Sequence, residues 1–122
     1  GMREVIPAVP VMIYDGDCEF CKRWRRRWQR LTGDAIEYAP YQEALERFPQ
    51  VSRESAEAAV QLVLPGGEVL SGAAAVCRTL RDVRGWGWAN RAYWNVSGFR
   101  LIAEALYRLV ARNRLVLSWL MR

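Results

Sequence analysis

The chain has 122 residues, a formal net charge of +5 and a hydrophobic fraction of 52%. This length and composition suit one globular domain, 1–122, and argue against intrinsic disorder. The chain contains no histidine, which excludes Ser-His-Asp triads, Cys-His catalytic pairs and zinc sites with histidine ligands. No signal peptide is visible, and no apolar run approaches the ~18 residues that span a bilayer, so we expect a soluble cytoplasmic protein.

The first 39 residues have the pattern of a strand-helix-strand unit. Residues 9–14 form a short apolar run with β-branched side chains, which predicts a buried strand. A turn at 15–17 separates it from a helix predicted over 19–31. The apolar stripe of that helix comprises Phe20, Trp24, Trp28 and Leu31. A second strand is predicted over 36–39, and the intervening helix makes the two strands parallel.

The middle of the chain has the pattern of short helices followed by a hairpin. Weak helical patterns cover 42–48 and 52–58. Two apolar stretches within 60–70 flank a Pro-Gly-Gly turn and predict a β-hairpin. A helix with one buried face is then predicted over 72–84, where Gly85 ends it.

Residues 86–122 are predicted to form a C-terminal helical extension. Trp86-Gly87-Trp88 has the composition of an aromatic loop, a helix is predicted over 94–112, and an apolar tail covers 115–121. The apolar face of this helix comprises Phe99, Ile102, Leu106, Leu109 and Val110. We favour packing of this face on the core, with dimerisation and contact with a membrane surface as alternatives.

The order of the predicted elements is that of the thioredoxin fold. A βαβ half is followed by a connecting helix and a ββα half, and the two halves share one small mixed sheet. We therefore predict an α/β domain with a thioredoxin-like fold, to which residues 86–122 add the helical extension.

Cys18 and Cys21 form a CxxC motif where the first strand ends and the first helix begins. In this context the motif indicates thiol-disulfide chemistry, because the helix N-terminus favours the thiolate that attacks disulfides. Cys18 precedes the helix, so we expect it to be exposed and to act as the nucleophile. Cys21 lies one turn inside, so we expect it to be more buried and to act as the resolving thiol.

Two other interpretations of the cysteine pair are open. In the first, the pair is half of a zinc site, for which Cys77 and carboxylates are the only further ligands that the sequence offers. In the second, both thiols are inert. An odd, small cysteine count does not describe a structural disulfide framework. We favour redox chemistry, expect no cofactor and no metal, and interpret Cys77 as a small buried hydrophobic residue.

The stretch Tyr14-Asp15-Gly16-Asp17-Cys18-Glu19-Phe20-Cys21 resembles the signature of the DCC family of predicted thiol-disulfide oxidoreductases. That family is named for an Asp-x-x-Cys-x-x-Cys motif, here Asp15, Cys18 and Cys21. Two further stretches, Ser71-Gly72-Ala73-Ala74-Ala75 and 107–114, are also similar to the family. The resemblance implies a thioredoxin-like fold and a redox-active cysteine pair.

Asp15 corresponds to the acidic residue of the family motif, and two roles for it are open. In one role, Asp15 exchanges a proton with Cys21. In the other, it only holds the turn before Cys18 by accepting hydrogen bonds from nearby backbone N–H groups. Asp17 is positioned to cap the following helix.

One feature departs from thioredoxin proper. Thioredoxins carry a cis-proline just before the third strand, facing the cysteine pair, whereas this chain has Ala58-Ala59-Val60 there. We therefore expect the backbone platform that receives a target peptide to be altered.

The charge pattern raises the question of other partners. Basic residues gather at both ends of the chain, and 22–30 is a basic run that contains two tryptophans. We favour an amphipathic helix over nucleic-acid binding, because the tryptophans are four residues apart. Trp86, Trp88 and Trp94 either pack on the core or line a lip that binds a target.

The function predicted from the sequence is therefore that of a thiol-disulfide oxidoreductase. It exchanges a Cys18–Cys21 disulfide or dithiol with a protein or small-molecule thiol or disulfide. The alternative is a non-catalytic thioredoxin-like binding module that docks a partner through its basic and tryptophan-rich surfaces. Nucleic acid is not expected as a partner, and peripheral membrane contact is not favoured.

Overall fold

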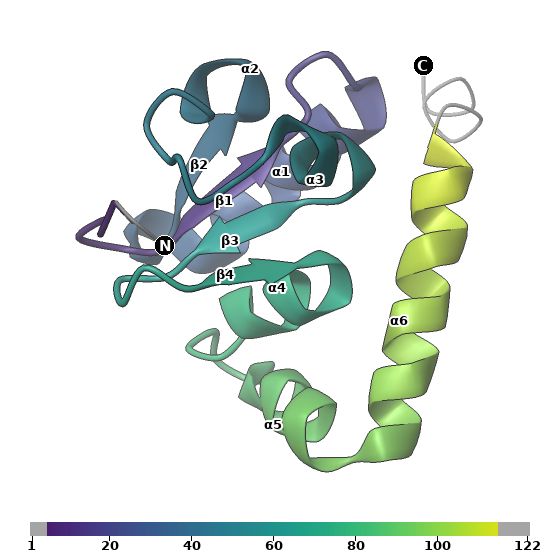
Figure 1. Cartoon of the computed structure of the whole chain (residues 1–122). Helices are drawn as coiled ribbons and strands as arrows, with labels where there is room; N and C mark the ends of the chain where they lie inside the picture. Colours follow the sequence, from purple (N-terminus) through teal and green to yellow (C-terminus); the bar gives the residue numbers. More distant parts are fainter. Residues whose placement is uncertain (1–4, 115–122) are drawn as a thin grey trace.

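A computed structural model describes residues 5–114 and has a four-stranded mixed sheet at its centre (Figure 1). The strands are β1 (Val11–Tyr14), β2 (Glu37–Pro40), β3 (Gln61–Val63) and β4 (Val69–Ser71), in the order β2-β1-β3-β4. β1 is parallel to β2 and antiparallel to β3, which is antiparallel to β4. This is the predicted thioredoxin-like arrangement of a βαβ half and a ββα half.

Six α-helices and one short 3-10 helix complete the described part of the chain. They are α1 (Glu19–Thr32), η1 (Gly33–Ala35), α2 (Tyr41–Ala44), α3 (Arg53–Ala58), α4 (Gly72–Thr79), α5 (Gly87–Asn95) and α6 (Ser97–Arg112). Core contacts place α2 and α3 on one face of the sheet and α1 and α4 on the other. Within the described residues, no helix combines the length and the apolar character needed to cross a membrane.

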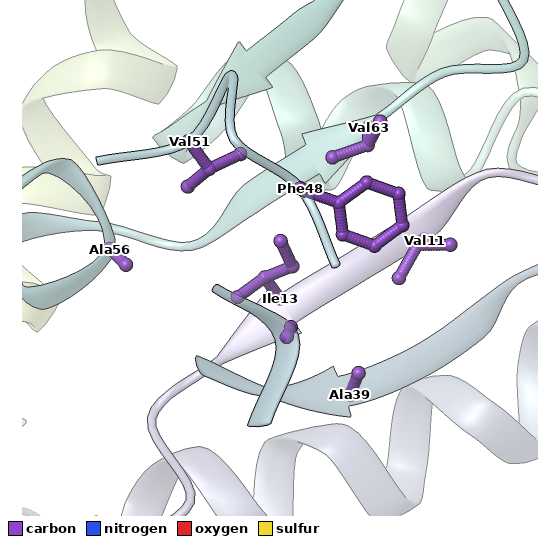
Figure 2. Packing of buried hydrophobic residues seen from close by; sticks show 8 residues of the cluster. Val11, Ile13, Ala39, Phe48, Val51, Ala56 and Val63 are labelled. Carbon is purple, nitrogen blue, oxygen red and sulfur yellow. The ribbon is translucent and has the colours of Figure 1, made fainter. Parts of the chain in front are cut away.

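Side chains along β1 point alternately to the two faces of the sheet, so the core has one part on each face. Val11 and Ile13 face α2 and α3, where they surround the fully buried ring of Phe48 (Figure 2). Met12 points to the opposite face and packs with Leu62 of β3. All four residues of β1 are buried, because β1 has a neighbouring strand on each side and a helical layer on each face.

The basic helix α1 presents its tryptophans to the interior, as predicted. Trp24 packs on the cluster around Met12 and stacks on Trp28 with ring centroids 4.9 Å apart. Trp28 Nε1 donates a hydrogen bond of 2.9 Å to Thr79 Oγ1 on α4. The periodic tryptophans therefore join two helices of the same layer.

Two helices end earlier than predicted. α2 ends at Ala44 instead of Phe48, and α4 ends at Thr79 instead of Arg84. After each end the backbone tightens into i-to-i+3 bonds, such as Leu80 N–H to Cys77 O at 3.1 Å. Phe48 and Leu80, beyond these two ends, are still buried, which is why the apolar spacing suggested longer helices.

The predicted aromatic loop at 86–88 is wrong, because α5 begins at Gly87. A Cβ atom at this position would lie 2.8 Å from the carbonyl oxygen of Arg81, so only glycine allows the chain to return so closely to the end of α4. The helix predicted from Trp94 is divided at Val96, whose extended backbone (φ −120°, ψ 104°) separates α5 from α6.

α6 packs on the rest of the molecule along one edge only (Figure 1). Phe99, Ala103 and Tyr107 contact the cluster formed by α4 and α5. The predicted burial of the whole apolar face is wrong, since Ile102 and Leu109 are 63% and 58% exposed. The packed edge is offset around the helix from the predicted stripe. The apolar tail predicted over 115–121 lies outside the described residues.

Candidate active site

The loop between β1 and α1 is held by Asp15 and by Gln42 of α2. Asp15 Oδ1 accepts hydrogen bonds from Asp17 N–H at 2.9 Å and from Gln42 Nε2 at 3.1 Å. Gln42 Oε1 accepts from Gly16 N–H at 3.1 Å. A Cβ atom on Gly16 would lie 2.7 Å from Cβ of Pro40, so this position requires glycine. Asp15 therefore holds the turn before Cys18, which is one of the two roles that the sequence left open.

Cys18 is the N-cap of α1. Its backbone is extended, and its Sγ accepts a hydrogen bond of 3.3 Å from Cys21 N–H. The prediction that Asp17 caps the helix is wrong, because the Asp17 carboxylate instead accepts from Gln42 Nε2 at 3.2 Å. The free N–H groups and the dipole at the start of α1 stabilise negative charge on the capping sulfur.

The predicted order of exposure of the two cysteines is wrong. Cys18 is only 7% exposed, whereas Cys21 is partly exposed. Cys18 is covered because its side chain folds back over the helix end to accept the Cys21 N–H bond. Cys21 points into a cavity between α1 and α6 instead of toward the sheet.

The environment of Cys21 disfavours its thiolate. Burial raises the pKa of Cys21 to about 12, and its hydrogen bond with the Cys18 side chain and the nearby charge of a Cys18 thiolate act in the same direction. The Arg114 guanidinium lowers the pKa, but by less than these effects raise it. With this pKa, Cys21 is a neutral thiol at neutral pH when the pair is reduced.

Arg114 brings the end of α6 to the cysteine pair. Its Nη1 lies 4.0 Å from Cys21 Sγ, and its Nη2 lies 3.6 Å from Asp15 Oδ2. Arg114 lies within the family-like stretch 107–114, but no role was predicted for it from the sequence. Its contacts with Cys21 and Asp15 join positions that are 93 and 99 residues apart, so no local pattern could predict them. Only the family-like stretch could have drawn attention to Arg114.

The side chain of Tyr107, on α6, contacts the backbone just before β3. This is the place where thioredoxins carry a cis-proline and this chain does not. The Tyr107 hydroxyl accepts a hydrogen bond of 2.9 Å from Val60 N–H. The ring approaches Gly72, where it would lie 3.4 Å from an added Cβ atom, and Gly72 has a φ of +60° that also favours glycine. The backbone donor at the start of β3 is therefore satisfied from within the chain.

Replacing Tyr107 with phenylalanine tests this contact. We expect Tyr107→Phe to lower the free energy of unfolding by about 1–3 kcal/mol, because Val60 N–H is left unpaired in a partly buried position. Urea unfolding followed by circular dichroism measures the change. Tyr41→Phe is the matched control, since it removes a hydroxyl without touching Val60. Superimposable unfolding curves for Tyr107→Phe and the wild-type protein would contradict the assignment.

A cavity of about 390 Å³ adjoins Cys21. Its walls come from α1, α3, α4, α6 and the segment before β3, and they are lined mostly by apolar side chains. Cys77 is 8% exposed, which confirms its predicted burial, and it lines the same cavity. Among residues 5–114, no three His, Cys, Asp or Glu side chains are gathered closely enough to hold a metal ion.

Comparison with known proteins identifies a family for this chain. No curated protein and no solved structure matches the chain. The model of the DCC1-like thiol-disulfide oxidoreductase family matches residues 12–120, a range that includes both cysteines, Asp15, Tyr107 and Arg114. The resemblance found in the sequence is thereby confirmed, and the match spans nearly the whole chain. The chain therefore belongs to the DCC1-like thiol-disulfide oxidoreductase family.

Proposed function

We propose that this chain is an enzyme that exchanges a Cys18–Cys21 disulfide or dithiol with a target. Membership of the family supports thiol-disulfide redox chemistry with thiol or disulfide substrates. The observation that carries the proposal is the hydrogen bond from Cys21 N–H to Cys18 Sγ at the start of α1. It places one sulfur where a helix N-terminus stabilises a thiolate and places the second sulfur one turn away.

The two sulfurs take different roles in this proposal. The Cys18 thiolate attacks one sulfur of a target disulfide, forms a mixed disulfide and releases the other sulfur as a thiolate. The Cys21 thiolate then attacks Cys18 Sγ, which forms the Cys18–Cys21 disulfide and releases the second target thiolate. Two electrons pass to the target, and the two protons of the dithiol pass to the two product thiols.

The environment of Cys21 supports this order. With a pKa raised to about 12, Cys21 is protonated when a target arrives and does not compete with Cys18 as nucleophile. Once Cys18 is in a mixed disulfide, it no longer carries the charge that opposes the Cys21 thiolate. The pKa of Cys21 therefore falls at the stage where its thiolate is needed.

Asp15 is proposed to accept the proton that Cys21 loses. Its carboxylate lines the same cavity as Cys21, and Arg114 lies beside both side chains. One carboxylate oxygen is used by the turn, while Oδ2 faces Arg114. In this arrangement Asp15 both holds the loop and serves the resolving thiol.

A second candidate function is the non-catalytic binding module, which the exposed tryptophans support. Trp86, Trp88 and Trp94 are 47%, 49% and 49% exposed. The rings of Trp86 and Trp88 stack at 6.3 Å, and Trp88 meets the Phe99 ring edge-on at 5.9 Å. Exposed aromatic clusters of this kind are typical of interaction surfaces.

The reduction potential of the Cys18–Cys21 couple tests the proposed enzyme. The full chain with Cys77→Ala is equilibrated in glutathione or dithiothreitol buffers, and free thiols are alkylated and counted by intact mass. We expect one reversible disulfide with a potential between about −300 and −120 mV, the range of thiol-disulfide enzymes.

The opposite outcome favours the binding module. If no disulfide forms between Cys18 and Cys21 under any oxidising buffer, the proposed redox cycle is wrong. The tryptophan surface would then become the leading functional site, and Trp88→Ala would be the variant to test for loss of partner binding.

A further inference from the structure

The cavity beside Cys21 has an apolar interior. Its walls include Leu106 and Val110 from α6 and Ala73 and Val76 from α4. A volume of about 390 Å³ lies within the range of small-molecule sites. The cavity is therefore large enough for an organic molecule and adjoins the sulfur that would complete the exchange.

The charges on the cavity wall are paired with each other. Among the described residues, Asp15 and Arg114 are the only Asp, Glu, Lys or Arg side chains that line it, and Arg114 Nη2 lies 3.6 Å from Asp15 Oδ2. A ligand with several charges would lose its hydration there without gaining a free counter-charge. This charge balance favours an uncharged molecule.

The backbone beside the cavity is poorly suited to an extended peptide. Peptides that bind at a strand edge rely on main-chain hydrogen bonds. Val60 N–H, the donor at the start of β3, already donates to Tyr107 Oη, and Tyr107 itself lines the cavity. A peptide would have to displace this tyrosine before using that donor.

From these observations we infer that the cavity binds the body of an uncharged, apolar, low-molecular-weight disulfide and presents its sulfur atoms to the dithiol. This inference rests on the proposed function and names its substrate class. Cys18 attacks one substrate sulfur and releases the first apolar thiolate, and Cys21 then closes the Cys18–Cys21 disulfide and releases the second. The substrate is reduced by two electrons, and both products leave as thiols.

Single-turnover rates with two disulfides test the substrate class. The reduced full chain is mixed with dibutyl disulfide or with oxidised glutathione, and the Cys18–Cys21 disulfide is located by mass after alkylation. Each rate constant is divided by that of dithiothreitol with the same disulfide, which removes differences in intrinsic reactivity. We expect the normalised rate constant to be at least about tenfold greater for dibutyl disulfide.

Variants that fill the cavity test where the substrate lies. Ala111 on α6 and Ala58 at the end of α3 line the cavity from different elements. We expect Ala111→Trp and Ala58→Trp each to slow the reaction with dibutyl disulfide about tenfold or more, and to slow the reaction with oxidised glutathione much less. Ala105→Trp is the matched control, because Ala105 is exposed on α6 and does not line the cavity.

The outcomes separate this inference from the proposed function. If the normalised rate constants for the two disulfides are equal, and Ala111→Trp and Ala58→Trp do not change them, the inference of an apolar substrate is wrong. The proposed redox function would still stand. If neither disulfide oxidises the Cys18–Cys21 pair, the proposed function itself fails.

Discussion

Cys18→Ser is expected to abolish disulfide exchange, whereas Cys21→Ser is expected to stop it halfway. Without the Cys18 sulfur, the remaining thiol of the pair has a pKa raised chiefly by burial, which disfavours the attacking thiolate. In Cys21→Ser the Cys18 sulfur stays at the N-cap and still attacks, but no second sulfur is present to release the target. Intact-mass analysis after mixing with an excess of disulfide therefore shows an unmodified site in the first variant and one stable adduct in the second.

Cys77→Ala is the control for both variants. Cys77 is buried in α4, and burial raises the pKa of its thiol, so we expect Cys77→Ala to keep both the attack by Cys18 and the formation of the Cys18–Cys21 disulfide. An adduct in Cys18→Ser that is as abundant as in Cys21→Ser would show that the nucleophile has been assigned to the wrong cysteine.

The second large effect is expected in the pH dependence of the resolving step. The pKa of Cys21 is about 12 in the free dithiol, and burial is the largest cause of this rise. We expect the pKa to fall once Cys18 is in a mixed disulfide but to stay above its ordinary value of 9.0, because the burial remains. Without a proton acceptor, the Cys21 thiolate fraction and the resolving rate would grow about tenfold per pH unit from about pH 7 to 9. We expect this steep profile in Asp15→Asn and a much shallower one in the wild-type protein.

At pH 7 the difference is largest, and we expect Asp15→Asn to resolve about 100-fold more slowly than the wild-type protein, the lower end of general-base effects. Stopped-flow absorbance with 4,4′-dithiodipyridine separates the two steps, because attack and resolution each release one coloured thione. The measurement is made in a Cys77→Ala background. Asp17→Asn is the matched control, since Asp17 also bonds Gln42 but does not line the cavity.

Two results would remove Asp15 from the proton transfer. Identical slopes in Asp15→Asn and the wild-type protein would leave Asp15 with its turn-holding role alone. Faster resolution in Asp15→Asn would show that its charge only opposes the Cys21 thiolate, because the Asp15 carboxylate raises the pKa of that thiol.

Local sequence patterns predicted the sheet well because each strand lies in a short, largely apolar segment between turn residues. β1 begins after Pro10 and ends before Asp15, and its predicted bounds differ by two residues at one end only. The CxxC position at the start of α1 was equally predictable, since the break in periodicity after β1 coincides with the first cysteine. In both cases the deciding interactions are made within a few residues of each other.

Contacts between distant segments could not be predicted in this way. Gln42 is a polar residue on a short helix, and nothing in its neighbourhood indicates that both ends of its amide hold the loop before Cys18. The reversed exposure of the cysteines has the same origin, because the cavity that receives Cys21 exists only when α6 stands beside α1. Helical spacing gives the direction of a side chain but not the segment that it meets.

The position of Arg114 also affects how the site is assembled during synthesis. The dithiol leaves the ribosome early, whereas the segment that supplies Tyr107 and Arg114 follows about 90 residues later, at roughly 5–20 residues per second. For several seconds the nascent chain carries both thiols without the wall that α6 provides. Closure of the cavity is therefore a late, high-contact-order event, and the apolar surroundings of Cys21 are completed only after the rest of the sheet is available.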